Sequence, residues 1–165
     1  MIDKIIFDTD MDTDCDDAAA LQMLIKAHFK KEIELIGVVC DSPSDYAAPA
    51  CDAICSYYGL DVPIATYVEN ECDKNTRFLK YHGHQNEMSD YMKYTHFLAK
   101  MVERKDYIPS TELYLKLLSD AADNSVVIVC VGLMSAVCGL FETPDGIELV
   151  KNKVKYIVSM TNAPY

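Results

Sequence analysis

The fold of this chain is decided by the stretch Ile5-Ile6-Phe7-Asp8-Thr9-Asp10-Met11-Asp12-Thr13-Asp14-Cys15-Asp16-Asp17-Ala18-Ala19-Ala20-Leu21. Its apolar start ends at Asp8, six aspartates occupy positions 8 to 17, and an alanine-rich run of helix-forming residues follows. A short apolar run that leads through a polar turn into a helix is the start of a βα unit. In an open parallel sheet this turn lies at the carboxyl end of the strand, where ligands bind.

The crowded carboxylates of this stretch indicate a bound cation. Two unit charges ~4 Å apart repel by ~4 kcal/mol at an effective dielectric constant of ~20. No Lys or Arg lies between Lys4 and Lys26, so the neutralising charge must come from a cation or from distant residues. Oxygen ligands favour Ca²⁺ or Mg²⁺ over zinc. The alternative is a solvated acidic turn with one aspartate as a helix N-cap.

Three known patterns compete for the aspartate-rich stretch. An EF-hand loop needs Gly at its sixth position and Glu at its twelfth, and neither residue is present when the loop starts at Asp8 or at Asp10. The phosphatases of the haloacid-dehalogenase type open with a strand and Asp-x-Asp-Gly-Thr, and only the first half of that motif matches Asp8-Thr9-Asp10. The third pattern combines Asp8-Thr9-Asp10 with Asp16-Asp17-Ala18 and resembles the inosine-uridine-preferring nucleoside hydrolases. The chain follows the longer form of their signature, Asp-Thr-Asp-x-Gly-x-Asp-x-Asp-Asp-Ala, with Asp12 in place of Gly.

The resemblance implies a calcium site and a hydrolytic activity on the N-glycosidic bond of a ribonucleoside. Asp10 and Asp17 would ligate Ca²⁺, Val131 would ligate it through its backbone carbonyl, and Asp14 is a further candidate ligand. Asp10 would also be the general base that takes a proton from a calcium-bound water. Asp12 would be either an extra ligand or an obstruction, since Gly permits a positive φ and close backbone approach to the metal.

The resemblance also implies substrate-binding residues. Asp16 would bind ribose hydroxyls, and Asp41, where the family commonly has Asn, would do the same. Met160 would line the ribose pocket and His82 would face the leaving base. Asp8 is interpreted instead as an ordinary turn residue.

The order of apolar runs and turn signals predicts an α/β fold with a mostly parallel sheet and helices on both faces, of the Rossmann-like, nucleoside-hydrolase type. The expected strands are residues 2–7, 34–40, 62–65, 126–131 and 154–160; the expected helices are residues 16–30, 44–58, 90–104, 109–122, 135–141 and 146–152. The carboxyl ends of the first, second, fourth and fifth strands are therefore expected to converge on one edge. At 165 residues the chain is expected to be a single domain, 1–165, that resembles the metal-binding first half of a nucleoside hydrolase.

Composition limits the partners. The net charge of −11 argues against nucleic acid, and no apolar run approaches the ~18 residues of a membrane span. The start of the chain carries no signal-peptide pattern, and most of the seven cysteines fall within predicted elements, which suits reduced thiols, so a cytoplasmic location is expected. Because family members are about twice as long, the resemblance implies that the chain is truncated, and a homo-oligomer or a partner that supplies the distal half is expected beside the ribonucleoside substrate. A non-catalytic protein that binds Ca²⁺ or ribose is the alternative function.

Overall fold

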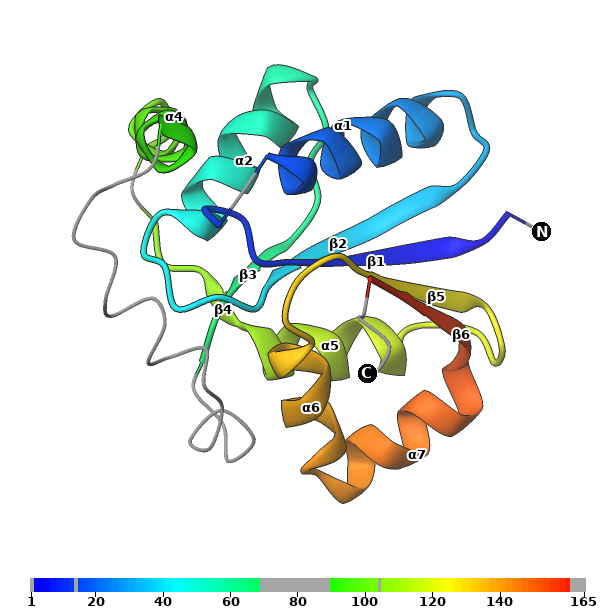
Figure 1. The fold of residues 1–165 in the computed structure, drawn as a ribbon. Helices are drawn as coiled ribbons and strands as arrows, with labels where there is room; N and C mark the ends of the chain where they lie inside the picture. Colours follow the sequence, from blue (N-terminus) through cyan, green and yellow to red (C-terminus); the bar gives the residue numbers. More distant parts are fainter. Residues whose placement is uncertain (1, 14, 69–89, 104, 161–165) are drawn as a thin grey trace, which may run out of the picture.

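The protein is described here by a computed structural model that covers residues 2–13, 15–68, 90–103 and 105–160. Its strands form one six-stranded parallel sheet in the order β4-β3-β2-β1-β5-β6, which is a Rossmann-like α/β arrangement (Figure 1). The strands are β1 (Lys4–Thr9), β2 (Glu34–Cys40), β3 (Ile64–Thr66), β4 (Ile108–Pro109), β5 (Val126–Cys130) and β6 (Val154–Ser159). The predicted fold class is thereby confirmed.

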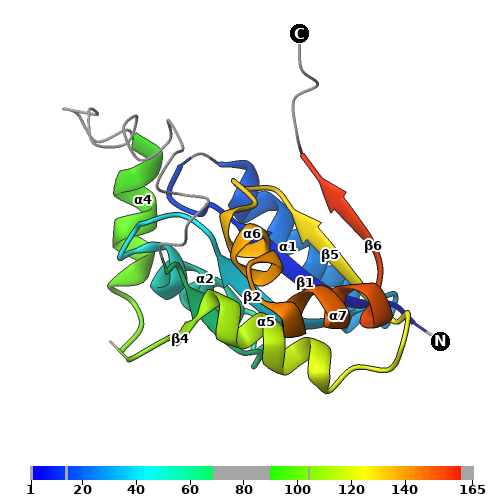
Figure 2. The ribbon, with the colours of Figure 1, turned by 90° about the horizontal axis from the view of Figure 1, so that it is seen from below.

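Helices cover both faces of the sheet. They are α1 (Asp16–Phe29), α2 (Ala47–Tyr57), α4 (Asp90–Ala99), α5 (Ser110–Ser119), α6 (Ser135–Phe141) and α7 (Pro144–Lys153). Figures 1 and 2 show α1, α2 and α4 on one face and α5, α6 and α7 on the other. This arrangement follows from the alternation of side chains along a strand, because Ile5 and Phe7 enter one hydrophobic cluster while Ile6 enters the other.

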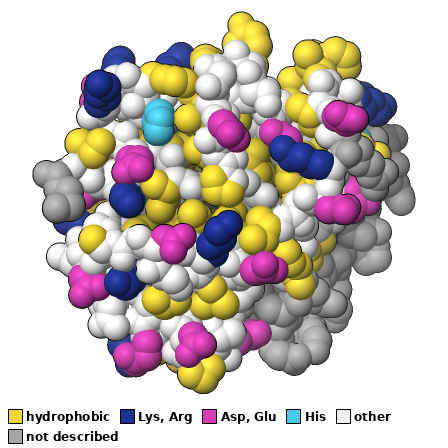
Figure 3. Space-filling view, turned by 180° about the vertical axis from the view of Figure 1, so that it is seen from behind, with side chains coloured by type: hydrophobic (Ala, Val, Ile, Leu, Met, Phe, Trp, Pro, Cys, Tyr) yellow, Lys and Arg dark blue, Asp and Glu magenta, His cyan; other side chains and the backbone are white. Residues whose placement is uncertain are grey.

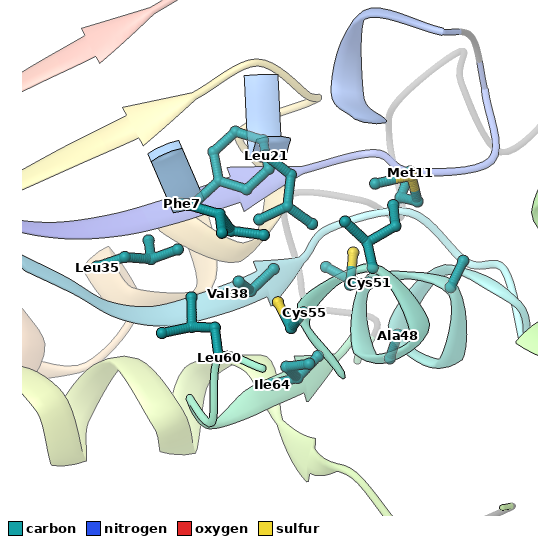
Figure 4. Packing of buried hydrophobic residues seen from close by; sticks show 14 of the residues in the cluster. Phe7, Met11, Leu21, Leu35, Val38, Ala48, Cys51, Cys55, Leu60 and Ile64 are labelled. Atoms are coloured by element: carbon teal, nitrogen blue, oxygen red, sulfur yellow. The ribbon is translucent and has the colours of Figure 1, made fainter. Parts of the chain in front are cut away.

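The cluster under α1 and α2 extends to the aspartate-rich loop. Phe7, Leu21 and Val38 pack between the sheet and these helices, as Figure 4 shows. Met11 belongs to the same cluster and is 1% exposed, although it lies between two aspartates. Burying an apolar side chain of this size contributes about 1.5–3 kcal/mol, so Met11 anchors the loop to the core.

The chain reverses its direction of travel across the sheet at β1. The first strands run outward from β1 through β2 and β3 to β4, whereas β5 returns to pair with the other side of β1. In open parallel sheets, ligands bind at the carboxyl end of the strands at this switch point. The register places Thr9 beside Cys40 and Asp8 beside Cys130, so the carboxyl ends of β1, β2 and β5 meet there as predicted.

Several elements differ from the prediction, and three of these differences have a plain physical cause. The first strand was expected to end at residue 7 but continues through Asp8 and Thr9, because parallel neighbours on both sides extend the ladder. The short β4 was not predicted, since two residues carry no periodicity. The helix expected over residues 90–104 ends at Ala99, where the N–H groups of Lys100 and Met101 bond to carbonyls three residues earlier and tighten the last turn.

The cysteines mostly match the expectation of reduced thiols. Free thiols are found at Cys15, Cys40, Cys51, Cys55 and Cys130. Those of Cys40 and Cys51 lie 3.9 Å apart inside the core, where they pack as small apolar groups. The expectation is wrong for Cys138, which is disulfide-bonded.

The surface seen from behind mixes charges of both signs. Figure 3 shows acidic and basic side chains interspersed on this face, and its described part has no continuous basic area. Among the described residues, every helix is too short or too polar to reach across a lipid bilayer.

Candidate functional site

The carboxylate of Asp8 lies inside the protein at the end of β1. Asp8 is 0% exposed and accepts a hydrogen bond of 2.6 Å from the phenol of Tyr114, on α5. The interpretation of Asp8 as an ordinary turn residue is therefore wrong. Aspartate is a poor strand former. Here the pairing of β1 with both flanking strands and the hydrogen bond from Tyr114 outweigh that preference.

Asp8 neighbours Asp41, which follows β2, and the two carboxylates repel each other; Asp8 Oδ1 and both carboxyl oxygens of Asp41 are buried without a hydrogen-bond partner among the described residues. Burial raises the pKa of Asp8 to about 6. The pKa of Asp41 is raised well above its usual value by burial and then by the neighbouring charge of Asp8. Two carboxyl groups this close hold a proton between them more readily than two negative charges. The pair is thus an acidic, proton-binding unit at the switch point.

Hydrogen bonds fix Asp41 against β1 and α6. Its N–H donates to the Thr9 carbonyl at 3.0 Å, and the Ser135 hydroxyl donates to the Asp41 carbonyl at 2.6 Å. Gly132 provides the space beside it: a Cβ at this position would lie 2.5 Å from the Asp10 nitrogen and 2.6 Å from Asp41 Oδ1. Only glycine lets the chain after β5 approach both residues.

A second carboxyl pair is formed by Asp10 and Asp17. The Thr9 hydroxyl donates a hydrogen bond to Asp17, in the first turn of α1, and the negative charge of Asp10 acts on Asp17. Burial raises the pKa of Asp17 to about 7, although the Thr9 hydrogen bond acts in the opposite direction. Burial also raises the pKa of Asp10. One proton on this pair, or a cation beside it, would relieve the repulsion.

The carboxylate oxygens of Asp10 and Asp17 fit one side of a calcium coordination shell. Asp17 Oδ2 is buried and makes no hydrogen bond, so a hard oxygen ligand is left without a partner. In the described part of the chain, no salt bridge neutralises Asp10 or Asp17. Nevertheless, no group of three or more His, Cys, Asp or Glu side chains is placed to hold a metal among the described residues. Ca²⁺ takes 6–8 oxygens, so these residues would provide only part of its coordination.

Asp12 takes the place of the Gly in the nucleoside-hydrolase signature, and its backbone has the positive φ that suits glycine. Its φ is +94°, in the region that most residues avoid. Its Oδ2 accepts a hydrogen bond of 2.6 Å from the Ser44 hydroxyl and lies 3.2 Å from His96 Nε2. Asp12 therefore ties the aspartate-rich loop to the turn before α2 and to α4.

Three of the other predicted residues lie within the described ranges, and two lie outside them. Asp16 is the first residue of α1 and is partly buried, and Val131 follows β5 directly, with its N–H bonded to the Asp8 carbonyl at 3.0 Å. Met160 is 59% exposed, and its N–H donates to the Cys130 carbonyl. His82 and Asp14 lie outside the described residues.

Sequence reasoning missed several residues of this site. Tyr114 and His96 lie on helices far along the chain, and no local pattern marks them as partners of aspartates. Thr9 and Gly132 had a weak signal, since each follows a strand that was expected to end at this edge.

Comparison with known proteins adds no assignment, because the chain matches no protein-family model and no curated protein sequence.

Proposed function

We propose that this chain carries the metal- and ribose-binding half of a nucleoside N-ribosyl hydrolase. The observation that supports the proposal is the Asp10–Asp17 pair at the switch point, with an unpartnered buried oxygen on Asp17. The Asp41 carboxyl and the Val131 backbone lie at the same sheet edge. The aspartate pattern that resembles the family is thus folded into a carboxylate cluster at the edge where such sheets bind ligands.

The residues of the chain would divide the work of hydrolysis. Asp10, whose pKa is raised by burial, is suited to accept a proton from the attacking water. Asp16 and Asp41 would hold the ribose hydroxyls, and the cluster's negative charge would stabilise the oxocarbenium-like transition state. Ca²⁺, when bound at Asp10 and Asp17, would supply positive charge that orients the ribose and acidifies the nucleophilic water.

A second candidate function is non-catalytic binding of Ca²⁺ or ribose. It is favoured by one observation, namely that no group of three or more acidic, His or Cys side chains is placed for a metal within the described ranges. An incomplete shell binds a cation weakly but need not support turnover.

Release of free base from purine and pyrimidine ribonucleosides tests the proposal. We expect release by the 165-residue chain with millimolar Ca²⁺, no release in EDTA, and a loss of about 10²–10⁴-fold in Asp10→Asn. Asp61→Asn is the matched control, because Asp61 is exposed and precedes β3 at the opposite edge of the sheet. Calorimetric Ca²⁺ binding without turnover would favour the second function, and neither binding nor turnover would refute both.

A further inference from the structure

A cavity of about 430 Å³ lies among three helices on one face of the sheet, and it shares no described lining residue with the carboxylate cluster (Figure 1). Ala18 and Gln22 line it from α1, Ile54 lines it from α2 and Leu98 from α4. We call it the α1–α2–α4 cavity. Small-molecule sites have volumes of about 300–1,000 Å³, so a molecule of one or two rings fits this space.

Short side chains and the end of a helix leave this space open. Ala18 on α1 and Ala53 on α2 end at Cβ, and α4 ends at Ala99. Tyr57 and Met101 line the cavity but are 83% and 65% exposed, so they lie at its mouth. Proteins contain few voids of this size, because the side chains around a void lose packing contacts. An occupant would restore those contacts.

The lining of the α1–α2–α4 cavity is uncharged. None of the described residues that line it is Asp, Glu, Lys, Arg or His, although a quarter of the chain is charged. Its polar side chains include Gln22 and Tyr58, and the Tyr58 hydroxyl donates to Gln22 Oε1 at 3.2 Å. A charged ligand would lose its water here without gaining a counter-ion. The net charge of −11 adds a long-range repulsion of anions. The cavity therefore selects an uncharged ligand.

The side chains at the mouth favour an aromatic ligand over an aliphatic one. The rings of Tyr57 and Tyr58 lie 5.2 Å apart at an interplanar angle of 89°. Aromatic rings prefer such edge-to-face contacts, and the exposed ring of Tyr57 has surface left for a further one. The thioether of Met101 also makes favourable contacts with aromatic rings. Even smaller apolar cavities, of about 150 Å³, bind benzene.

We propose that the α1–α2–α4 cavity binds a small, uncharged aromatic molecule of one or two rings. The inference is independent of the proposed function, because this site requires neither Ca²⁺ nor a nucleoside. It gives the chain a second ligand site, in the helical layer rather than at the carboxyl ends of the strands.

Indole, in EDTA, is the probe that tests the inference. The chain contains no Trp, so indole fluorescence can be followed without a protein background. We expect saturable binding together with shifts of the Ile54 and Leu98 methyl resonances. Indole-3-carboxylate should bind at least about tenfold more weakly, because its carboxylate would be desolvated without a partner. No saturation up to the solubility limit of indole, saturation without these shifts, or equal affinity for the two probes would overturn the inference.

Two variants locate the binding. Tyr57→Ala should weaken indole binding about two- to tenfold, the value of one aromatic contact, and should fold normally because Tyr57 is largely exposed. Tyr94→Ala is the matched control, since Tyr94 is 69% exposed and does not line the cavity. Ala53→Leu should block binding by filling the space, and its melting curve shows whether it is folded. Equal affinities of Tyr57→Ala and Tyr94→Ala, or full binding by folded Ala53→Leu, would refute this site.

Discussion

The phenol of Tyr114 donates a 2.6 Å hydrogen bond to Asp8, across 106 positions of sequence. Both side chains are 0% exposed, so neither can replace the other with water. This one contact joins α5 to the end of the central strand and sets the first carboxyl pair in place.

Replacing Tyr114 by Phe should destabilise the fold by about 1–3 kcal/mol, because a buried acceptor on Asp8 loses its donor. It should also raise the pKa of Asp8 further, since this hydrogen bond lowers it. Urea denaturation measures the first effect and NMR titration the second. Tyr94→Phe is the control, because Tyr94 is 69% exposed. Equal losses in both variants would contradict the prediction.

The stability of the metal-free protein should fall as the pH rises from about 4 to 7. The pKa of Asp8 is raised from 3.8 to about 6 and that of Asp17 from 3.8 to about 7, so the folded state binds more protons than the unfolded state within this window. Melting in EDTA at pH 5 and pH 8 measures the trend. Asp17→Asn should flatten it, because the amide does not titrate. A slope that Asp17→Asn leaves unchanged would show that another group dominates.

Millimolar Ca²⁺ should raise the melting midpoint at pH 8, because a ligand that binds only the native state stabilises it. The increase should shrink at pH 5, where protons compete for Asp10 and Asp17. Differential scanning calorimetry measures the melting midpoint with Ca²⁺ and with EDTA. Identical midpoints, together with no calorimetric binding signal, would exclude the proposed cation.

Gly132→Ala should destabilise the protein by about 1–3 kcal/mol or more, since its Cβ would lie 2.5 Å from a backbone nitrogen and 2.6 Å from the Asp41 carboxylate. Gly59→Ala is an instructive comparison, because Gly59 has φ +72° but open space around it. That change should cost only about 1–2 kcal/mol of backbone strain. Urea denaturation of both variants measures the difference, and equal losses of stability would contradict the prediction.

The open edge of β6 should drive self-association. Among the described strands β6 pairs only with β5, and its outer side chains Tyr156 and Val158 are 48% and 50% exposed. Unprotected apolar edges invite pairing with another chain. Light scattering coupled to size exclusion should give a mass above 18.5 kDa at micromolar concentration, and Val158→Lys should reduce it. A monomeric mass for both proteins would show that the β6 edge does not cause self-association.

The sequence was sufficient for the fold class and for the convergence of strand ends, because both follow from local periodicity and from parallel-sheet geometry. It was insufficient wherever a partner lies far along the chain. Asp8 looks like a turn residue until Tyr114 is placed beside it, and Asp12 looks like an intrusion until His96 reaches it from α4. Local propensity contains no information on such pairs, since they depend on which helix covers which face.

The position of β1 between β2 and β5 also has a consequence for synthesis on the ribosome. About 120 residues separate β1 from its partner β5, and translation at ~5–20 residues per second needs ~6–24 s to cover them. During that time the edge of β1 that will pair with β5 is unpaired. Asp8 also lacks its partner Tyr114 until α5 has been made. The aspartate-rich loop is thus made well before the strand and the helix that complete its surroundings, so protection of β1 against premature pairing should favour correct assembly.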